Sequence, residues 1–512
     1  MKRILVLLLP LLIVFAIAIV KEPSASAERP RVYALKDARI VVEPGKIIPK
    51  GNVIIRDGVI AAAGANVPIP PDAEEIDVAG KTVYAGFIDA STNVGLRRST
   101  TTTTATAGRG GNQIAALLAA QTSPAQAAPG ANHPIARVHP EMEARNLLVP
   151  FEPPATATTA PAAGAGGGGA AGGAGAGAAA QPQTEAERYR NIGFTTVLVE
   201  PDSGIFRGTD AIINLRDSTP VTQLIVKDGV AQHIALEMRG GFGGGGGAYP
   251  GSLMGVIASI RQAFLDTQRY QVWKQRYAAH PEGMKRLEYS PSFEALLPVI
   301  GGESLVVFDT EAGEDILAAS RIAHEFNLHK IVMGADTNTF EMVDRVAAVK
   351  CPLILSAAMP EKPRLDDADE AAETDTRELR RFVDAPTTAK KLYDAKVQFV
   401  LSTRGIRNVA DFPHNVKRMI DAGLPTDAAL AALTTGPAKL LGVQSLMGTV
   451  EKGKLANVIV TDGDLFQPNT HILRIFVDGY EYMGAPIPNR QNAPPRPPGE
   501  PIGGTPREGD AQ

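Results

Sequence analysis

The central part of the chain alternates short apolar runs with amphipathic stretches at helical spacing. The apolar runs are typical of buried strands and fall at residues 194–199, 305–308, 330–333, 352–355 and 397–401. Helical stretches lie between the later runs, at residues 314–326, 340–349 and 386–395, and another helix is expected after Ser252, a residue type that favours the N-cap. Apolar strands alternating with helices predict a parallel sheet covered on both faces. We interpret this as an α/β fold with a TIM-like (β/α)8 barrel, and an open doubly wound sheet is the alternative.

Both ends of this region consist of short strand-like runs separated by turns. Apolar runs flank Asp57-Gly58, a dipeptide typical of hairpins, and the same texture returns at residues 456–463 and 475–480. Chain termini often lie close together. We therefore expect residues 28–84 and 445–484 to form a small composite β-sandwich beside a barrel of residues 85–444.

Two segments have too few large apolar side chains to fold, and two further runs have a loop-like composition. Residues 155–180 contain only Ala, Gly, Thr and Pro, which predicts a disordered insertion at about 153–184. The proline-rich tail, residues 485–512, is expected to be extended and mobile. A threonine run at 99–111 is expected to be a mobile loop, and a glycine run at 240–247 is either a barrel-mouth loop or a floppy expansion.

The N-terminus has the build of a secretory signal peptide. A basic start precedes the apolar residues 4–20, and an Ala-Ser-Ala cleavage site follows at residues 25–27. An uncleaved membrane anchor is the alternative, but Pro10 and the cleavage site favour removal of residues 1–27. We expect an exported protein, periplasmic or extracellular, with no stable membrane span.

Charge and cysteine content exclude several classes of function. The formal net charge is −4 and the basic residues are scattered, which argues against a nucleic-acid surface. Cys351 is the single cysteine, so the chain has no internal disulfide and no multi-cysteine zinc site. Its apolar setting predicts a packed thiol.

A motif at the start of the expected barrel points to a family. Gly86-Phe87-Ile88-Asp89 lies where the first barrel strand would run, and Ser91 and Asn93 follow it. This stretch resembles the amidohydrolase superfamily, in particular its imidazolonepropionase-like members, in which such a strand ends in a metal-binding His-x-His pair. A closing pattern that resembles the same family lies at residues 429–430, 434–439, 441–442, 448–450, 453–454 and 456–457. The resemblance implies a divalent metal and hydrolysis of non-peptide carbon–nitrogen bonds.

The chain departs from this pattern at each metal-ligand position that can be placed. Ser91 and Asn93 stand where the histidine pair is expected, and hydroxyl and amide oxygens bind such ions weakly. Arg404 stands where the resemblance implies a last-strand aspartate, and a guanidinium cannot act as a base. Asp309 and Asp336 fall near the fifth- and sixth-strand histidine positions, and no lysine can be placed on the fourth strand.

The eight histidines offer no replacement set of ligands. His324 and His329 resemble a zinc helix, but their spacing turns the two rings about 140° apart. The others lie beside prolines, loops or expected element ends. Isolated surface or packing roles are therefore expected for His133, His139, His233, His280, His414 and His471.

Three functions remain open. The first is a metal-free, catalytically degenerate relative that binds a small molecule or peptide at the barrel mouth and needs no cofactor. The second is an active hydrolase of non-peptide carbon–nitrogen bonds, with a divalent metal in an oxygen-rich site formed by Asp89, Glu200, Asp309 and Asp336. Such strand-end carboxylates can equally cap loops or pair with Arg404. The third is a structural protein of the cell envelope. The candidate site residues are Asp89, Ser91, Asn93, Glu200, Asp309, Asp336 and Arg404.

Overall fold

The computed structural model describes residues 32–97, 133–135, 137–151, 183–217, 220–236, 250, 252–363 and 374–484. The predicted signal peptide, the threonine run, nearly all of the predicted insertion, the second glycine run and the proline-rich tail lie outside the described residues. Within the part that is described, no helix combines the length and apolarity needed to cross a membrane.

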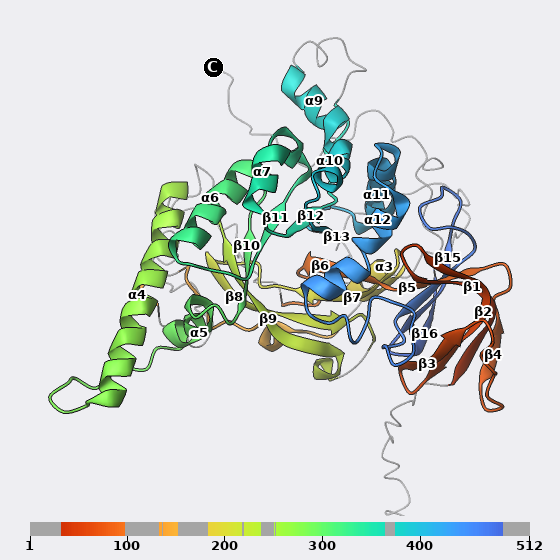
Figure 1. Cartoon of the computed structure of the whole chain (residues 1–512), viewed down its shortest axis with the longest axis horizontal. Coiled ribbons are helices and arrows are strands. Elements are labelled where there is room, and N and C mark those ends of the chain that lie inside the picture. Colours follow the sequence, from red (N-terminus) through yellow and green to blue (C-terminus); the bar gives the residue numbers. More distant parts are fainter. Residues whose placement is uncertain are drawn as a thin grey trace, which may run out of the picture.

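Eight strands in the middle of the chain form a nearly closed barrel, which confirms the predicted TIM-like α/β architecture (Figure 1). They follow one another around the barrel in sequence order: β6 (Phe87–Thr92), β7 (Phe194–Val199), β8 (Phe206–Asn214), β9 (Ile225–Ala235), β10 (Leu305–Asp309), β11 (Ile331–Ala335), β12 (Leu353–Ser356) and β13 (Phe399–Ser402). Main chain from a later segment fills the gap between the first and last strands. There Ile88 donates a hydrogen bond to the carbonyl of Leu433, and Leu401 donates one to that of Ala432.

One barrel strand runs against its neighbours. β8 pairs antiparallel with both β7 and β9, whereas β6–β7 and the pairs from β9 to β13 are parallel. Residues 200–205 alone connect β7 to β8, and this loop is too short for the helical crossover that a parallel partner needs. The expectation of a purely parallel sheet therefore fails at β8.

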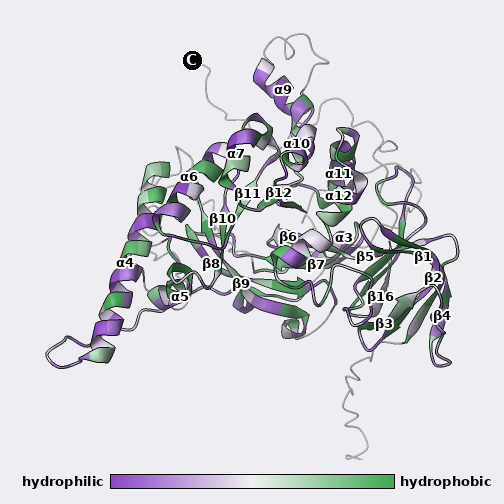
Figure 2. Cartoon of the chain, in the orientation of Figure 1, coloured by the Kyte–Doolittle hydropathy of each residue, from purple (hydrophilic) through white to green (hydrophobic). Residues whose placement is uncertain are grey.

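Helices cover the outside of the barrel, with apolar positions facing the strands (Figures 1 and 2). The three helices expected between the later strands are confirmed as α6 (Gly313–Glu325), α7 (Val343–Val349) and α10 (Thr388–Asp394). Ser252 caps α4 (Leu253–Ala279), because its side chain accepts a hydrogen bond from the main-chain nitrogen of Gly255 at 3.1 Å. The remaining helices are α3 (Glu185–Arg190), α5 (Pro291–Ile300), α9 (Thr376–Asp384), α11 (Phe412–Asp421), α12 (Thr426–Ala431) and α13 (Thr435–Leu440), and short 3-10 turns are η1 (Ala144–Leu147), η2 (Val221–Leu224), η3 (Thr337–Glu341), η4 (Ala385–Thr387) and η5 (Val409–Asp411).

The two ends of the described chain share a second sheet, as the sequence predicted. Its strands are β1 (Tyr33–Glu43), β2 (Lys46–Arg56), β3 (Val59–Gly64), β4 (Glu74–Asp77), β5 (Thr82–Ala85), β14 (Val458–Thr461), β15 (Ile472–Val477) and β16 (Tyr480–Met483). The N-terminal and C-terminal strands join where β5 pairs antiparallel with β14. The sheet has an apolar core of its own, separate from that of the barrel.

The interior of the barrel is filled by a layer of small and branched apolar side chains. The layer consists of Ala90, Ala231, Val307, Val332, Ile354 and Val400. Alternate residues of a strand point to the same face, so the next inward positions lie two residues further along. On β9, β10, β11 and β12 these positions are His233, Asp309, Gly334 and Ser356. The strand period thus places a polar layer directly above an apolar one, at the barrel mouth.

Candidate functional site

A buried histidine lies at the centre of this polar layer. Nδ1 of His233 lies 2.7 Å from Oε2 of Glu200 and donates a hydrogen bond to Oδ1 of Asp309, 3.2 Å away. The short contact with Glu200 is not aligned for a hydrogen bond, so the proton on Nδ1 points to Asp309. All three side chains are buried.

The second ring nitrogen of His233 also faces a carboxylate. Nε2 donates to Oδ2 of Asp210, on β8, at 3.1 Å. The other oxygen of Asp210 accepts hydrogen bonds from the main-chain nitrogens of Val230 and Ala231, at 2.8 and 2.9 Å, which hold the carboxylate in place. An ionised carboxylate only accepts hydrogen bonds, so both ring nitrogens of His233 must carry a proton to donate to Asp309 and Asp210.

Electrostatics favour the same charged form of the histidine. Burial alone would lower the pKa of His233, but the charges of Glu200 and Asp309 and the hydrogen bond to Asp210 outweigh it and raise the pKa well above its usual value. His233 is therefore an imidazolium held among three carboxylates.

Two arginines bind Asp309 from either side. NH1 of Arg207, on β8, donates to Oδ2 at 2.9 Å, and NH1 of Arg404, just past β13, donates to Oδ1 at 3.0 Å. Burial would raise the pKa of Asp309, but the charges of Arg207, Arg404 and His233 overcome it and hold the pKa far below its usual range. The Arg207–Asp309 pair is buried, whereas the Arg404 side chain keeps 23% of its surface exposed.

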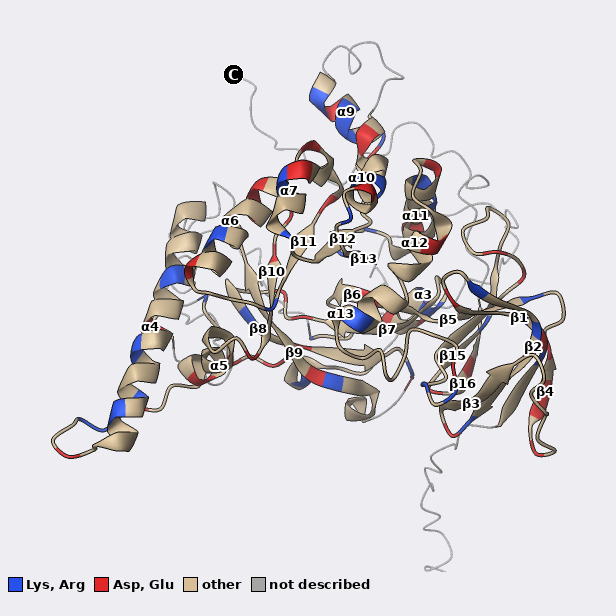
Figure 3. Ribbon diagram, in the orientation of Figure 1, with Lys and Arg blue, Asp and Glu red and all other residues tan. Residues whose placement is uncertain are grey.

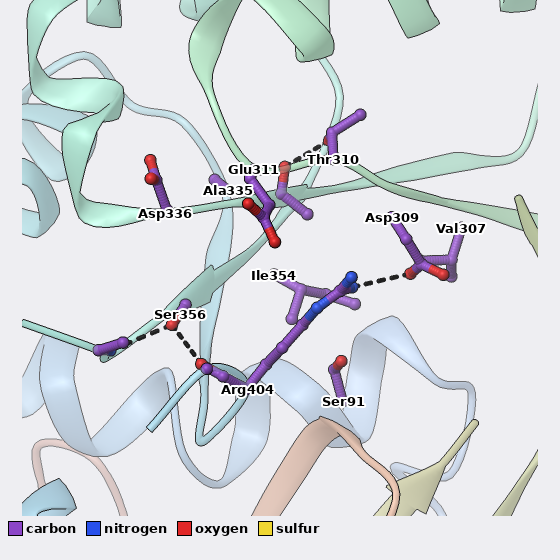
Figure 4. A pocket seen from close by; sticks show the side chains of 13 residues that line it. Ser91, Val307, Asp309, Thr310, Glu311, Ala335, Asp336, Ile354, Ser356 and Arg404 are labelled. Carbon is purple, nitrogen blue, oxygen red and sulfur yellow. Dashed lines mark hydrogen bonds and ion pairs between the residues drawn. The ribbon is translucent and has the colours of Figure 1, made fainter. Parts of the chain in front are cut away.

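A cavity of about 190 Å³ opens above this cluster. Its polar lining includes Ser91, Asp309, Glu311, Ser356 and Arg404. Figure 4 shows the guanidinium of Arg404 crossing the cavity toward Asp309, with Ser91 below it and Glu311 on the opposite wall. Within the cluster, Arg404 is the cation that lines the cavity and can contact a molecule bound there.

Ser91 and Asn93, the two candidates that follow the first-strand motif, lie in different environments. Ser91 is buried and donates a hydrogen bond from its hydroxyl to Oε1 of Glu200 at 2.9 Å, so it belongs to the site. Asn93 does not, because β6 ends at Thr92 and the side chain beyond it is exposed. Of the two, Ser91 alone lines the cavity.

Asp89 lies beside the cluster, in a separate role. Its carboxylate accepts hydrogen bonds from the hydroxyl of Thr403 at 2.5 Å and from the main-chain nitrogens of Thr403 and Ser91. Burial raises the pKa of Asp89 to about 7, although these hydrogen bonds act to lower it. Asp89 thus joins the first strand to the segment after the last one.

Asp336 lines the cavity, but its carboxylate caps a helical turn. It accepts hydrogen bonds from the main-chain nitrogen of Asn338 at 3.0 Å and from the side chain of Asn338 at 2.6 Å. Its pKa is raised by burial. Figure 4 shows its carboxylate turned away from Arg404 and Asp309.

Sequence reasoning missed three central residues: Arg207, Asp210 and His233. The expectation that His233 has an isolated surface or packing role is wrong, since the ring is buried and contacts three carboxylates. The run Val230-Ala-Gln-His-Ile-Ala is typical of a strand, and its pattern would have placed the imidazole of His233 on the inward face. Arg207 and Asp210 lie on β8, whose polar residues hide the pattern of a buried strand.

The side chains of the cluster include a group that could hold a divalent metal ion. Among the described residues, Glu200, His233 and Asp309 form the group whose ligand atoms all lie within 4.8 Å of one another, and neither Asp89 nor Asp336 joins it. Carboxylates and an imidazole suit zinc in type. A ligating imidazole needs a free lone pair, however, and both nitrogens of His233 donate to carboxylates. Arg404 places a positive charge against Asp309 and Glu200, so in this arrangement the residues do not fit a divalent ion.

Comparison with known proteins agrees with the architecture. Residues 320–483 match the family model described as Amidohydrolase family. The structure of an amidohydrolase from Thermotoga maritima MSB8 superimposes with a TM-score of 0.62 at 22% sequence identity, over 88% of this chain and 100% of that one. Molinate hydrolase is a more distant neighbour, with a TM-score of 0.46 and 14% identity over 92% of this chain and 99% of that one, and its likeness adds no weight. No curated protein matches the sequence.

These findings bear out the resemblance of the closing motif. The family match covers the closing pattern, and the shared fold covers both the barrel and the composite sheet. Residues 320–483 thus carry the signature of the Amidohydrolase family, and the fold of the chain is similar to that of the Thermotoga maritima amidohydrolase.

Proposed function

We propose that this chain binds a small polar ligand at the barrel mouth without a divalent metal ion, as an exported member of its superfamily. One observation carries the proposal: Arg404 ion-pairs with Asp309 at 3.0 Å and lines the cavity from the position where the resemblance implies a metal-binding aspartate. A fixed positive charge then lies where the family's chemistry would have its ion.

The charges of the cluster balance without a metal. Arg207, Arg404 and the imidazolium of His233 face the carboxylates of Glu200, Asp210 and Asp309. A divalent ion would add two positive charges to a buried, already neutral group, and it would have to displace a proton or a guanidinium. This arrangement supports the metal-free hypothesis over the second hypothesis, in which Asp89, Glu200, Asp309 and Asp336 form an oxygen-rich site for a metal ion.

The cavity suits a ligand with an acceptor at one end and a donor at the other. Arg404 contacts Asp309 and Glu200 through NH1 and lines the cavity, so its planar guanidinium can donate hydrogen bonds to a molecule bound there. Glu311, on the opposite wall, supplies an acceptor. The apolar side chains of Val307 and Ile354 complete the lining. A small amide or amino-acid derivative has this pattern, with its carbonyl or carboxylate oxygen on Arg404.

Two further parts of the proposal rest on surface charge and on the N-terminus. Figure 3 shows acidic and basic residues mixed along outer helices such as α9, which favours a small-molecule ligand over nucleic acid. The basic start, apolar run and Ala-Ser-Ala site of residues 1–27 support export to the periplasm or the extracellular space.

Metal analysis and calorimetry of the purified protein test the proposal together. We expect less than stoichiometric bound metal, and binding of at least one compound from a panel of cyclic amides, ureas and small dipeptides, unchanged by a chelator. Arg404→Met should abolish that binding. Arg407→Met is the matched control, because Arg407 pairs with Glu361 on the surface and keeps 88% of its side chain exposed.

Two results would overturn the proposal. Stoichiometric metal together with turnover that a chelator removes would identify a metal-dependent hydrolase of carbon–nitrogen bonds. Ligand binding that survives in Arg404→Met would show that the ligand does not use Arg404.

A further inference from the structure

Ser91 differs from the other hydroxyl groups that line the cavity. The hydroxyl of Thr310 donates to the carbonyl of Gly334 at 2.6 Å, and that of Ser356 donates to the carbonyl of Arg404 at 2.5 Å. A main-chain carbonyl cannot take up their protons. Ser91 instead donates to a carboxylate, Oε1 of Glu200, at 2.9 Å. Of these three hydroxyls, Ser91 is the one next to a group able to accept its proton.

Glu200 lies between the strand that carries Ser91 and the ring of His233. Its main-chain nitrogen donates to the carbonyl of Thr92 at 2.9 Å, which ties it to the end of the strand that carries Ser91. Its other carboxylate oxygen lies 2.7 Å from Nδ1 of His233, and the far side of that ring is bound to Asp210 at 3.1 Å. A nucleophile within hydrogen-bond reach of a base, with the base oriented by a third group, is the structural signature of covalent catalysis.

A cation lies where negative charge would develop. NH1 of Arg404 is 3.6 Å from Oε1 of Glu200, the same oxygen that accepts the hydrogen bond from Ser91. A carbonyl group placed between Ser91 and Arg404 would therefore have a hydroxyl on its carbon side and guanidinium N–H donors on its oxygen side. Fixed donors of this kind stabilise an oxyanion.

We propose that Ser91 is a nucleophile for acyl transfer, with Glu200 as its proton acceptor and Arg404 as the oxyanion donor. This rests on the proposed function, because the substrate binds in the same cavity with its carbonyl oxygen on Arg404. The substrate class is a small amide or ester that fits about 190 Å³. The site would then hydrolyse such compounds through the protein's own side chains.

The steps balance without a further reagent. Oγ of Ser91 bonds to the carbonyl carbon while its proton passes to Glu200, and the oxyanion forms against Arg404. The bond from carbon to the amine or alcohol breaks, and the leaving group takes the proton from Glu200. Water then attacks the acyl-serine ester, gives its proton to Glu200, and the acid leaves as that proton returns to Oγ of Ser91.

Labelling with an alkyl fluorophosphonate tests the nucleophile directly. This probe bonds to an activated serine oxygen and releases fluoride. We expect one adduct per chain, located on Ser91 by peptide mass spectrometry and lost in Ser91→Ala. Glu200→Gln keeps the shape of the side chain but removes the proton acceptor, and it should slow labelling by about 100-fold or more. Ser320→Ala is the control, because the hydroxyl of Ser320 bonds a main-chain carbonyl on α6 and lies away from the cavity.

Calorimetry with the amide panel separates this proposal from the one on which it rests. Panel binding that survives in Ser91→Ala while labelling disappears supports both proposals. A native protein that binds the panel but takes no label, or takes it elsewhere, overturns the nucleophile and leaves the binding function standing. Labelling at the native rate in Glu200→Gln overturns the role of Glu200. Thermal melting of each variant excludes loss of the fold as the cause.

Discussion

Asp89 and Thr403 link the first and last strands of the barrel at its mouth. The carboxylate of Asp89, on β6, accepts hydrogen bonds from the Thr403 hydroxyl at 2.5 Å and from its main-chain nitrogen at 3.2 Å, just past β13. Ser91, two residues after Asp89, and Arg404, next to Thr403, line the cavity from these same two segments. This contact between the first and last strands therefore also fixes the relative positions of the segments on which both proposals depend.

Asp89 should make the stability of the protein depend on pH. Burial raises its pKa from 3.8 to about 7, so the folded state binds a proton that the unfolded state releases. This contribution is complete below about pH 4 and is lost as the pH rises through 7, and it amounts to at most about 4 kcal/mol. Asp89→Asn should remove that fall in the free energy of unfolding, measured by urea denaturation between pH 4 and 7.

The control for this measurement is Asp394→Asn. Asp394 is exposed on α10 and pairs with Lys390, so the slope of stability against pH should stay as in the native protein. An Asp89→Asn protein with the native slope would contradict the assignment of the raised pKa.

Replacing the imidazolium at the centre of the cluster should be costly. His233→Gln leaves Glu200, Asp210 and Asp309 facing a neutral group in a buried site. We expect a loss of about 3–5 kcal/mol in the free energy of unfolding, measured by chemical denaturation. His471→Gln removes an exposed histidine paired with Asp462 and should change stability by less than about 1 kcal/mol. Equal effects of the two substitutions would rule out a special role for His233.

The buried pair of Arg207 and Asp309 should show strong energetic coupling. Either single change, Arg207→Met or Asp309→Asn, leaves a charge in a buried position without its partner at 2.9 Å. A double-mutant cycle should give a coupling of about 2–3 kcal/mol. The exposed pair Arg261–Glu325, at 2.8 Å, is the comparison and should give less than about 1 kcal/mol. Similar coupling in both cycles would contradict this prediction.

Gly334 should tolerate no side chain at the cavity wall. An added Cβ would lie 2.5 Å from the carbonyl oxygen of Thr310, a main-chain atom that cannot move aside. We expect Gly334→Ala to lower the free energy of unfolding by about 1–3 kcal/mol and to weaken panel binding. In Gly64→Ala the Cβ would meet Val67 at an ordinary 3.4 Å, so its melting temperature should stay close to native. A Gly334→Ala protein with native stability and binding would show that the wall can relax.

Local patterns in the sequence were enough to predict most of the architecture. Apolar strands and helices between residues 305 and 401 were placed within a few residues, because a buried strand and an amphipathic helix each carry a repeating pattern over neighbouring positions. The composite sheet followed from the matching texture of the two ends. Ser91, Asp309 and Arg404 were found because motifs and strand ends marked them. Asn93 lies just past the end of β6, which the local pattern did not show.

The chemistry of the barrel mouth was decided by tertiary structure alone. Arg207, Asp210 and His233 lie on β8 and β9, and the charges they meet come from strands as far as β13 in the sequence. No local sequence pattern predicts which strands are neighbours or that β8 is antiparallel to β7 and β9. The sequence by itself determined which elements form and that Ser91, Asn93 and Arg404 stand where the resemblance implies metal ligands. Closure of the barrel brings charged residues that are distant in sequence within 4 Å of one another. Because the buried site has a low dielectric, each of these charges strongly affects the protonation of its neighbours.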